Sequence, residues 1–393
     1  MKSGNSMKVL LVDNSLDSTG ASKALVKTIS EVRSPDIGFV FLFPKNSKCV
    51  EATEKKGFKT YTLKLRELSK RVSNVVLYFP TLFVNTFKAS RIIKNEKITI
   101  VHANDIYNML GVSLKLFSRV KLITHIRRMP ESFPSIFYKT WSRLHLKYAD
   151  HIIAVSAANK NALPANNKTT VIYDPLPDEE ELPVYVPRPK LENSVNILYL
   201  ANYTEGKGHR YALEILQKAL RENKAWNFSL NFYGGEFGMK KNSDYKRSLV
   251  KLSQENGLSS IVVFKDKTTR VEETMKQYDL VMNLSDSESF SRVTLEALFY
   301  GIPVIATDVG GTREMVINEE TGILVPPKVI PAMYEGFMKL ISDDHLRVQL
   351  SQNAYKYVRY QFGKRNTVDK LVDVYRRVIQ QQTTQGEREG QAS

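Results

Sequence analysis

The feature that most constrains the fold is an alternation of short apolar runs with helical patterns, which occurs twice along the chain. Apolar runs of about four to eight residues predict buried strands, and amphipathic segments fit between most of them. In the first half the expected strands are Val9–Val12, Ile37–Leu42, Thr60–Leu63, Ile98–His102, Lys121–His125, Ile152–Val155 and Thr170–Ile172. The second half repeats the pattern at Val195–Leu200, Phe228–Tyr233, Ile261–Phe264, Leu280–Leu284, Pro303–Ala306 and Gly322–Val325. This alternation predicts an α/β fold with parallel sheets covered on both faces.

A proline-rich, acidic segment separates the two series. Asp174–Asn193 carries five prolines, and proline lacks the backbone donor that the interior of a strand or helix needs. We therefore expect two doubly wound domains, with ligands beyond the carboxyl ends of the strands and in the cleft between the sheets. The expected boundaries are 7–175 for the first domain, 176–194 for the linker, 195–362 for the second domain, 363–380 for a C-terminal helix with the option of crossing back to the first domain, and 381–393 for a disordered tail.

The net charge of the chain lies entirely in its first half. The 393 residues hold 57 Lys and Arg against 41 Asp and Glu, a formal charge of +16. Residues 1–175 hold 28 basic and 12 acidic residues, whereas residues 176–393 hold 29 of each. This asymmetry predicts an anionic partner for the first domain, and it leaves nucleic acid, an anionic membrane surface and an acidic substrate open. The single cysteine, Cys49, cannot form an internal disulfide and indicates a reducing compartment.

The stretch Ser285–Ala306 (SDSESFSRVTLEALFYGIPVIA) carries the most chemistry. Glu288 follows an apolar strand at once, and Glu296 lies eight residues later, inside a helix that begins at Arg292 or the next residue. Carboxylates at such a place can accept hydrogen bonds from sugar hydroxyls. The helix N-terminus near Phe290 offers free N–H groups that suit a diphosphate. Spacing alone leaves an acidic surface turn with an exposed helical glutamate equally open.

Two further loops follow expected strands in the second half. Lys207, in the loop ANYTEGKG, precedes a helix and can reach phosphate oxygens as a point charge. Gly310 and Gly311, in PVIATDVGG, let the backbone approach a ligand closely. A solvated lysine and an ordinary tight turn are the alternatives that these patterns leave open.

The run from Glu288 to Val316 (ESFSRVTLEALFYGIPVIATDVGGTREMV), followed by ETGILVPP, resembles the retaining nucleotide-sugar glycosyltransferases of the GT-B fold, family 4 (glycosyl transferases group 1). The signature of that family is a glutamate, seven residues and a second glutamate. The order of segments agrees over most of residues 7–380, and the resemblance is specific across about residues 280–326. It implies two facing Rossmann-like domains, the first binding the acceptor and the second binding the nucleotide sugar.

The resemblance also implies roles for individual residues. Glu288 would hold hydroxyls of the donor sugar, Glu296 would hold the ribose, and Lys207 would bind the diphosphate. Further donor contacts are implied for Gly20, Phe290, Ser291 and Arg292.

One histidine agrees with this family, and one pair of residues departs from it. His125, at the end of LITH, resembles the active-site histidine of the family, although a lone histidine at a strand end is more often structural. The family has Gly-Arg where this chain has Ala201-Asn202, so Asn202 replaces a cationic phosphate ligand with a neutral hydrogen-bond donor. Arg292 and Arg210 are the candidates to supply the missing charge.

The segment Lys64–Lys97 places an aromatic, apolar stretch between basic flanks. This pattern predicts a peripheral contact with an anionic inner leaflet, and the alternative is a pair of core-packing helices with solvated lysines. The apolar stretch, about 13 residues with Pro80 inside it, is too short to span a bilayer. Candidate acceptor or membrane residues are Lys70, Arg71, Phe79, Phe83, Arg127 and Arg128.

These patterns together predict a retaining hexosyl- or N-acetylhexosaminyltransferase that acts in bacterial surface polysaccharide or glycolipid synthesis. The expected donor is a UDP- or GDP-linked sugar, and the expected acceptor is lipid-linked or a glycan. We expect a cytoplasmic enzyme, peripheral at the inner face of the cell membrane, with no cofactor, no metal and no nucleic-acid partner. A nucleotide-sugar epimerase on the same fold and a nucleic-acid-binding protein are the rival hypotheses, the latter supported by the charge alone.

Overall fold

A computed structural model describes residues 7–17, 19–66, 72–132, 135–177 and 191–390, without the side chains of 72–75 and 381–390. The chain separates into two compact units. The first unit is Met1–Pro175 together with Lys364–Ser393, and the second unit is Leu176–Gly363. Each unit carries its own parallel sheet and its own buried apolar core.

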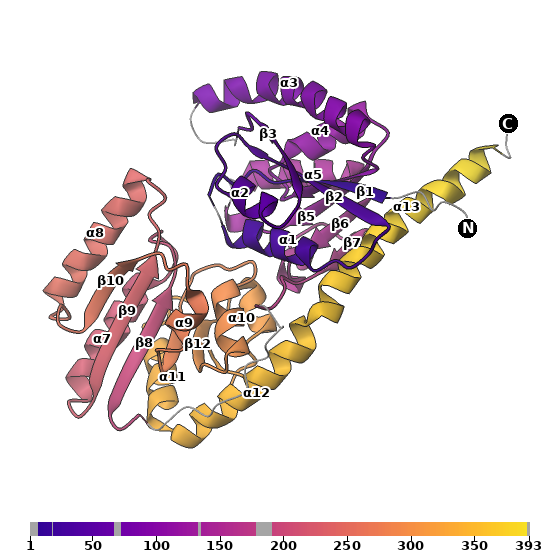
Figure 1. The fold of residues 1–393 in the computed structure, drawn as a ribbon. Coiled ribbons are helices and arrows are strands. Elements are labelled where there is room, and N and C mark those ends of the chain that lie inside the picture. The colour runs from indigo at the N-terminus through magenta and orange to yellow at the C-terminus, as the bar shows by residue number, and fades with distance from the viewer. Residues whose placement is uncertain (1–6, 18, 67–71, 133–134, 178–190, 391–393) are drawn as a thin grey trace. The chain divides into compact units, whose positions relative to one another are not determined.

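The first unit is built on a seven-stranded sheet with the order β3-β2-β1-β4-β5-β6-β7 (Figure 1). Its strands are β1 (Met7–Val12), β2 (Ile37–Pro44), β3 (Lys59–Leu63), β4 (Ile100–Asn104), β5 (Lys121–Ile126), β6 (His151–Ala154) and β7 (Thr169–Val171). All neighbouring strands are parallel, so that Val9 of β1 lies opposite Phe39 of β2 and Ile100 of β4. Helices cover both faces of such a sheet, which is why β1 and β4 are apolar and buried almost throughout.

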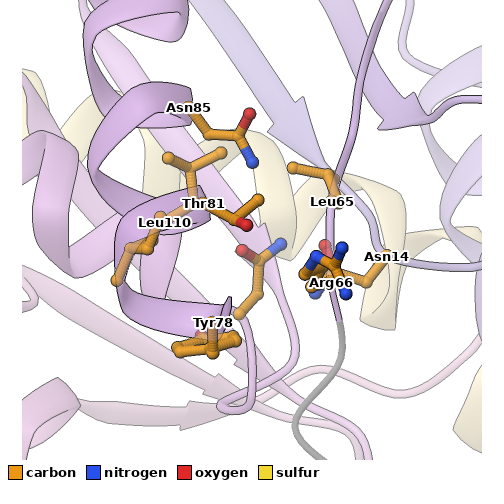
Figure 2. Close-up of a pocket in the computed structure, with 9 residues that line it drawn as sticks. Asn14, Leu65, Arg66, Tyr78, Thr81, Asn85 and Leu110 are labelled. Carbon is orange, nitrogen blue, oxygen red and sulfur yellow. The ribbon is translucent and has the colours of Figure 1, made fainter. Parts of the chain in front are cut away.

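The helices of the first unit connect these strands. They are α1 (Gly20–Ser30), α2 (Cys49–Glu54), α3 (Val72–Glu96), α4 (Met109–Phe117), η1 (Pro130–Ser132), α5 (Ser135–Tyr148), α6 (Ala157–Asn161), η3 (Lys364–Asn366) and α13 (Val368–Gly390). One face of α3 lines a pocket (Figure 2), and its opposite face is exposed.

The second unit repeats the architecture with six parallel strands in the order β10-β9-β8-β11-β12-β13. Its strands are β8 (Ser194–Leu200), β9 (Asn227–Gly234), β10 (Val262–Asp266), β11 (Leu280–Asn283), β12 (Val304–Thr307) and β13 (Ile323–Val325). Its helices are α7 (His209–Glu222), α8 (Lys240–Glu255), α9 (Val271–Met275), α10 (Arg292–Phe299), η2 (Gly310–Glu314), α11 (Ile330–Ser342) and α12 (Asp344–Phe362).

Both sheets contain a point at which the strand order reverses. It lies between β1 and β4 in the first unit and between β8 and β11 in the second. Loops at the carboxyl ends of such strand pairs diverge and leave room for a ligand. The loops after β1 and β4 and those after β8 and β11 are therefore the places to look for a site in each unit.

The last helix of the chain packs on the first unit. Leu371, Val374, Tyr375 and Val378 of α13 join the core that β1 and β2 build. The Tyr375 hydroxyl lies 2.7 Å from Nδ1 of His102 on β4. The apolar residues recur at helical spacing, so α13 presents one apolar stripe to the sheet.

The structure differs from the sequence interpretation in three places. Residues 72–96 form one long helix, α3, which continues through Pro80, whereas the alternative to a membrane contact was a pair of helices. The sequence also predicts a helix over Thr312–Ile317, where the structure has the short 3-10 turn η2. Helix α13 continues to Gly390, through most of the tail for which we expected no structure. Its Gln-, Glu- and Arg-rich sequence favours elongation once a helix is nucleated.

Two other expectations concern segments that the structure does not describe. The expected linker falls mostly on residues 178–190, and Lys70 and Arg71 fall within 67–71; both segments lie outside the described residues. Among the described parts of the chain, no helix combines the length and the apolarity that a bilayer span requires.

Candidate active site

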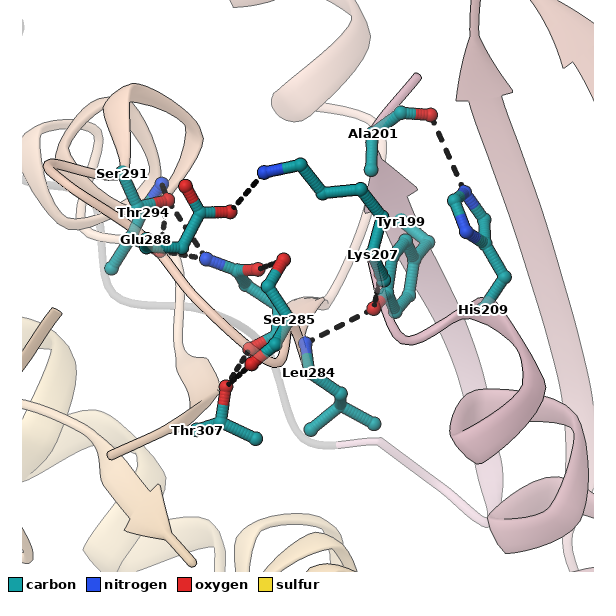
Figure 3. Close-up of polar contacts among 11 residues, drawn as sticks. Tyr199, Ala201, Lys207, His209, Leu284, Ser285, Glu288, Ser291, Thr294 and Thr307 are labelled. Atoms are coloured by element: carbon teal, nitrogen blue, oxygen red, sulfur yellow. Dashed lines mark hydrogen bonds and ion pairs between the residues drawn. The ribbon is translucent and has the colours of Figure 1, made fainter. Parts of the chain in front are cut away.

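In the second unit, a lysine and a glutamate meet beyond the carboxyl ends of the central strands. Lys207 lies in the loop after β8, and Glu288 lies in the loop after β11. Their side chains form an ion pair of 2.7 Å from Nζ to Oε1 (Figure 3). The pair keeps contact with solvent, since 33% of the Lys207 side chain and 15% of the Glu288 side chain are exposed. A cation and an anion are thus presented together at the edge of this sheet.

The Lys207 loop is fixed against the end of β11. The buried Tyr199 hydroxyl donates to the Lys207 carbonyl at 2.6 Å and accepts the Leu284 N–H at 3.1 Å. Gly208 has φ +71°, and a Cβ there would lie 2.0 Å from the Leu284 carbonyl oxygen. Only glycine fits so close an approach at that φ. Tyr199 was hidden in the apolar run of β8, where it looked like an ordinary core residue.

The Glu288 loop is held by the expected double-glycine turn. The Gly311 N–H donates to the Glu288 carbonyl at 3.1 Å. A Cβ on Gly310, at φ +46°, would lie 1.8 Å from the same oxygen. The close approach that these glycines allow is therefore to the backbone of Glu288.

A buried asparagine orders the start of α10. The Asn283 amide donates to Ser291 Oγ at 2.8 Å and to Thr294 Oγ1 at 3.0 Å. Ser291 is the N-cap, and its hydroxyl accepts the Thr294 N–H. The sequence offered one signal for Asn283, because a polar residue in a buried strand needs a partner.

Glu296 and Arg292 on α10, and Phe290 just before it, have different surroundings. Glu296 forms an ion pair of 2.8 Å with Arg292, which lies one turn earlier on α10. The charge of Arg292 is therefore already balanced by a carboxylate. The Phe290 ring is only 8% exposed and packs on Phe362, 5.6 Å between ring centroids. A ligand could therefore contact the backbone of Phe290 more readily than its ring.

Asn202, which stands where the family has an arginine, is tied to a neighbouring loop through its side-chain carbonyl oxygen. Its Oδ1 accepts the Gly235 N–H at 3.2 Å and so ties its own loop to the one after β9. Arg210, the second candidate, donates to Ser248 on α8 at 3.1 Å. Lys207 is thus the cation that the second unit places beside Glu288.

In the first unit, His125 is buried at the end of β5. Its ring stacks on His102 with 5.5 Å between centroids, and its Nδ1 lies 3.3 Å from an Arg127 nitrogen. Burial, and next the Arg127 charge, hold the pKa of His125 well below its ordinary value. His125 is therefore neutral at neutral pH.

Arg127 departs from the role expected for it. Its side chain is only 4% exposed, and it forms an ion pair of 2.5 Å with Asp174. Its Nε donates to Asn104. A guanidinium committed in this way orders the site around His125 and is not available to attract an anionic headgroup. Arg128, in contrast, is 46% exposed and lies over the Tyr107 ring at 4.4 Å.

The remaining candidates lie elsewhere in the first unit. Gly20 is the first residue of α1, behind a capping box that Thr19 and Ser22 form. Phe79 and Phe83 are 60% and 56% exposed on α3. Nowhere in the described ranges do three or more His, Cys, Asp or Glu side chains gather as a metal site would require.

Comparison with known proteins finds a glycosyltransferase family model in each half of the chain. The family model "Glycosyl transferases group 1" matches residues 187–357, and "Glycosyltransferase Family 4" matches residues 52–180. The chain is 35% identical to a D-inositol 3-phosphate glycosyltransferase of Corynebacterium urealyticum over 133 residues, which cover 33% of this chain but only 31% of that relative. It is 28% identical to an uncharacterized glycosyltransferase of Methanocaldococcus jannaschii over 308 residues, 76% of this chain and 80% of that relative.

Among solved structures, Anabaena HepE in complex with UDP-glucose superposes with a TM-score of 0.77 at 19% identity, over 96% of this chain and 100% of that one. At 19% sequence identity, this structural similarity establishes that the two proteins share a fold and nothing further. The two matched models lie on the two units that the structure separates and together cover most of the chain. The chain therefore carries a glycosyltransferase family 4 domain in its first half and a glycosyl transferases group 1 domain in its second, on the GT-B fold that it shares with HepE.

Proposed function

We propose that the protein is a retaining glycosyltransferase that moves a sugar from a nucleotide diphosphate sugar to a lipid-linked or glycan acceptor in bacterial surface polysaccharide or glycolipid synthesis. The observation that carries the proposal is the Lys207–Glu288 ion pair at the carboxyl edge of the second sheet. The α10 N-terminus, capped by Ser291, follows Glu288 by four residues. HepE, which shares the fold, binds UDP-glucose.

The two charges suit the two parts of such a donor. The ammonium of Lys207 would bind the diphosphate, whose oxygens gain charge as the sugar departs. The positive end of the α10 dipole would add to this stabilisation. The Glu288 carboxylate would accept hydrogen bonds from sugar hydroxyls, and Glu296 would do the same for the ribose.

Acceptor attack from the face that the diphosphate leaves would retain the configuration at the anomeric carbon. The acceptor hydroxyl loses its proton to the departing phosphate oxygen, so this route needs no carboxylate base. His125, which is buried and neutral, would contact the substrates with its backbone or ring rather than through a charge.

The donor assignment predicts a selective response to nucleotides. Among UDP, GDP and ADP, we expect one to raise the melting temperature, as measured by thermal shift, because a ligand that binds only the native state stabilises it. With the matching sugar donor alone, the sugar configuration should stay unchanged in NMR spectra. Formation of an epimer without acceptor would instead support the epimerase hypothesis, and no response to any of the three nucleotides would contradict the donor site.

We also propose that the first unit contacts an anionic membrane surface at the inner face of the cell membrane. The support is an apolar ridge, which we define as the exposed side chains of α3 and the end of α4. It comprises Val76, Leu77, Phe79, Phe83, Val84, Phe87, Leu116 and Phe117. Phe87 and Phe117 lie 6.3 Å apart and join the two helices. The next turns of α3 carry three exposed basic residues, Lys88, Arg91 and Lys94. Basic side chains next to an exposed apolar surface suit binding to an anionic membrane interface.

The membrane proposal predicts that the double substitution Phe79→Ser, Phe83→Ser lowers binding to vesicles of phosphatidylglycerol and phosphatidylcholine by about tenfold or more, since two large apolar side chains leave the interface. Sedimentation with vesicles measures the bound fraction. Tyr360→Ser is the matched control, because Tyr360 is an exposed aromatic residue of the second unit. Equal binding to purely zwitterionic vesicles, or an unaffected double variant, would contradict the proposal.

A further inference from the structure

Two buried histidines lie against each other on neighbouring strands of the first unit. His102 lies on β4 and His125 on β5, and their rings stack with 5.5 Å between centroids and 27° between planes. In each ring Nε2 is buried and lacks a partner among the residues that the structure describes. The other nitrogen, Nδ1, is in each case bonded to a side chain of the protein. These two bonds determine the protonation and the orientation of the pair.

Arg127 determines which nitrogen of the His125 ring carries the proton. An Arg127 nitrogen lies 3.3 Å from His125 Nδ1, and a guanidinium can only donate hydrogen bonds. Nδ1 must therefore accept, and because the ring is neutral its single proton lies on Nε2. The Nε2–H is thus a buried donor without an acceptor in the described parts of the chain, and it remains available to an oxygen that a substrate brings.

Arg127 is itself held from two further sides. It forms the ion pair of 2.5 Å with Asp174, and its Nε donates to Asn104. A guanidinium is planar, so two fixed partners set the plane from which it donates to His125. The carboxylate of Asp174 also balances the charge of Arg127 in a place where both side chains are 5% exposed or less. Removal of that charge would leave a buried cation without compensation.

Tyr375 determines the state of His102 in a similar way. Its hydroxyl lies 2.7 Å from His102 Nδ1, and both side chains are fully buried. Burial raises the pKa of Tyr375, so the hydroxyl keeps its proton and needs an acceptor. Donation from the hydroxyl to Nδ1 places the His102 proton on Nε2. The opposite direction would leave two polar hydrogen-bonding groups without a partner in the described chain instead of one, so we assign the first.

The two outer members of this network lie on the segments by which the chain passes between its units. Asp174 directly precedes Pro175, the last residue of the first unit before the chain enters the second at Leu176. The proline restricts the backbone of the residue before it, which helps to hold the carboxylate in place. The chain returns to the first unit at Lys364, and Tyr375 lies on the helix that follows, α13. One segment therefore supports the histidine pair through the arginine, and the other supports it directly.

We propose that Asp174 and Tyr375 are positioning residues that fix the ring of His125 for the transfer reaction. Asp174 acts through Arg127 and sets the tautomer, whereas Tyr375 acts through His102 and sets the plane of the ring. Both residues act through another side chain, so neither has to touch a substrate. The inference rests on the proposed function for the reaction itself, and it adds the two residues that orient the histidine.

The tautomers can be measured on the full-length protein without any substrate. Proton–nitrogen correlation spectra of a histidine-labelled sample distinguish protonated from unprotonated ring nitrogens, and His102→Gln and His125→Gln assign the two rings. At neutral pH we expect the proton on Nε2 in both. Tyr375→Phe should let the His102 proton exchange between its two nitrogens and should shift the signals of His125. A wild-type His125 with its proton on Nδ1 would overturn the role of Asp174, and unchanged spectra of Tyr375→Phe would overturn that of Tyr375.

The effect on rate is measured as hydrolysis of the nucleotide sugar by water, which needs no acceptor. The probe is UDP-glucose, GDP-mannose or ADP-glucose, according to the nucleotide that raises the melting temperature. Tyr375→Phe, which deletes one hydroxyl, and Asp174→Asn should each lower kcat about tenfold or more, because a misoriented group loses rate, while KM stays within about threefold. Tyr61→Phe and Asp36→Asn are the matched controls with full kcat. They remove a bonded hydroxyl and an arginine-paired carboxylate of the first unit that do not contact the histidines.

A double-mutant cycle with His125→Ala separates a positioning role from a general structural one. If Tyr375 and Asp174 act through His125, neither substitution should lower the rate of His125→Ala by more than about twofold, because the ring that they orient is already gone. The full tenfold loss in that background would show that the substitutions damage the fold, and it would overturn the proposal. A wild-type protein with neither nucleotide response nor hydrolysis would instead contradict the proposed function, while the spectra would still decide how the two rings are held.

Discussion

Replacement of Lys207 by methionine is expected to lower the rate of sugar transfer, kcat, by about 100- to 1000-fold, the range found when one preorganised donor to a developing anion is removed. Methionine keeps much of the length and loses the charge, so the diphosphate would leave without its cation. The ion pair with Glu288 is partly solvated, and such pairs contribute about 1 kcal/mol or less to stability. The variant should therefore fold normally. Initial rates with saturating donor and acceptor measure the effect.

Two companion variants test whether the loss belongs to this position. Lys241→Met removes another lysine of the second unit, which is 71% exposed and paired with Glu205, and it should keep full activity. Glu288→Gln should impair transfer while the affinity for the free nucleotide stays within about threefold of the wild-type value, because Glu288 is assigned to the sugar. A Lys207→Met enzyme within tenfold of the wild-type rate would contradict the assignment of the phosphate site.

The strands could be predicted from the sequence because burial on both faces leaves a run of largely apolar residues. Val9–Val12 and Leu280–Leu284 are examples, and both coincide with observed strands to within two residues. The order of the strands was not predicted, because the chain passes from β3 across β2 and β1 to β4, and from β10 across β9 and β8 to β11. The family motif then indicated which strand ends carry Lys207 and Glu288.

The contacts that build the site could not be predicted in the same way. Tyr199 bonds to Leu284, 85 positions along the chain, and no local pattern marks such a pair. Arg127 and Arg128 are adjacent and chemically identical in the sequence. The fold buries the first against Asp174 and exposes the second, so their different surroundings follow only from tertiary structure.

Helix α3 shows a local rule overridden by its surroundings. Pro80 removes a backbone donor and crowds the preceding turn, which usually breaks a helix. Its position is exposed, so solvent can satisfy the carbonyl that loses its partner. Tyr78 on one side and Asn85 on the other are buried against the unit. The packing of these flanking turns maintains one continuous helix where the sequence allowed two.

The second large effect expected is a loss of stability of the first unit between pH 6.5 and 5. Burial, and next the Arg127 charge, lower the pKa of His102 to about 3, and burial lowers the pKa of His145 to about 4. The pKa of His125 is also well below its ordinary value. In the unfolded chain each histidine takes up a proton near pH 6.5. The unfolded state then binds more protons than the native state, so stability falls as the pH falls through this window and is unaffected above it.

The size of this effect is large for a marginally stable domain. His151 adds to these three, because burial, and next the Arg377 charge, lower its pKa to about 4. Each of the four histidines contributes up to about 1.4 kcal/mol of destabilisation per pH unit, together up to about 6 kcal/mol per pH unit, against a typical total stability of about 5–15 kcal/mol. Carboxylates act at lower pH. Glu96, whose contacts with Lys59, then Lys8 and Tyr61, lower its pKa from 4.5 to about 2, affects stability only below about pH 4.5.

Urea unfolding at pH 7.0, 6.0 and 5.5 measures the effect, and the two tryptophans allow the units to be followed separately. Trp141 lies in the first unit and Trp226 in the second, so Trp226→Phe leaves a fluorescence signal from the first unit alone. His145→Gln should remove about one quarter of the pH slope because it deletes one of four histidines of the first unit whose pKa is lowered. His345→Gln, at an exposed position of the second unit, should leave the slope unchanged. An unfolding midpoint of the first unit that is the same at pH 7.0 and 5.5 would mean that these histidines are protonated or hydrated in the native protein, and it would remove the argument that His125 acts as a neutral group.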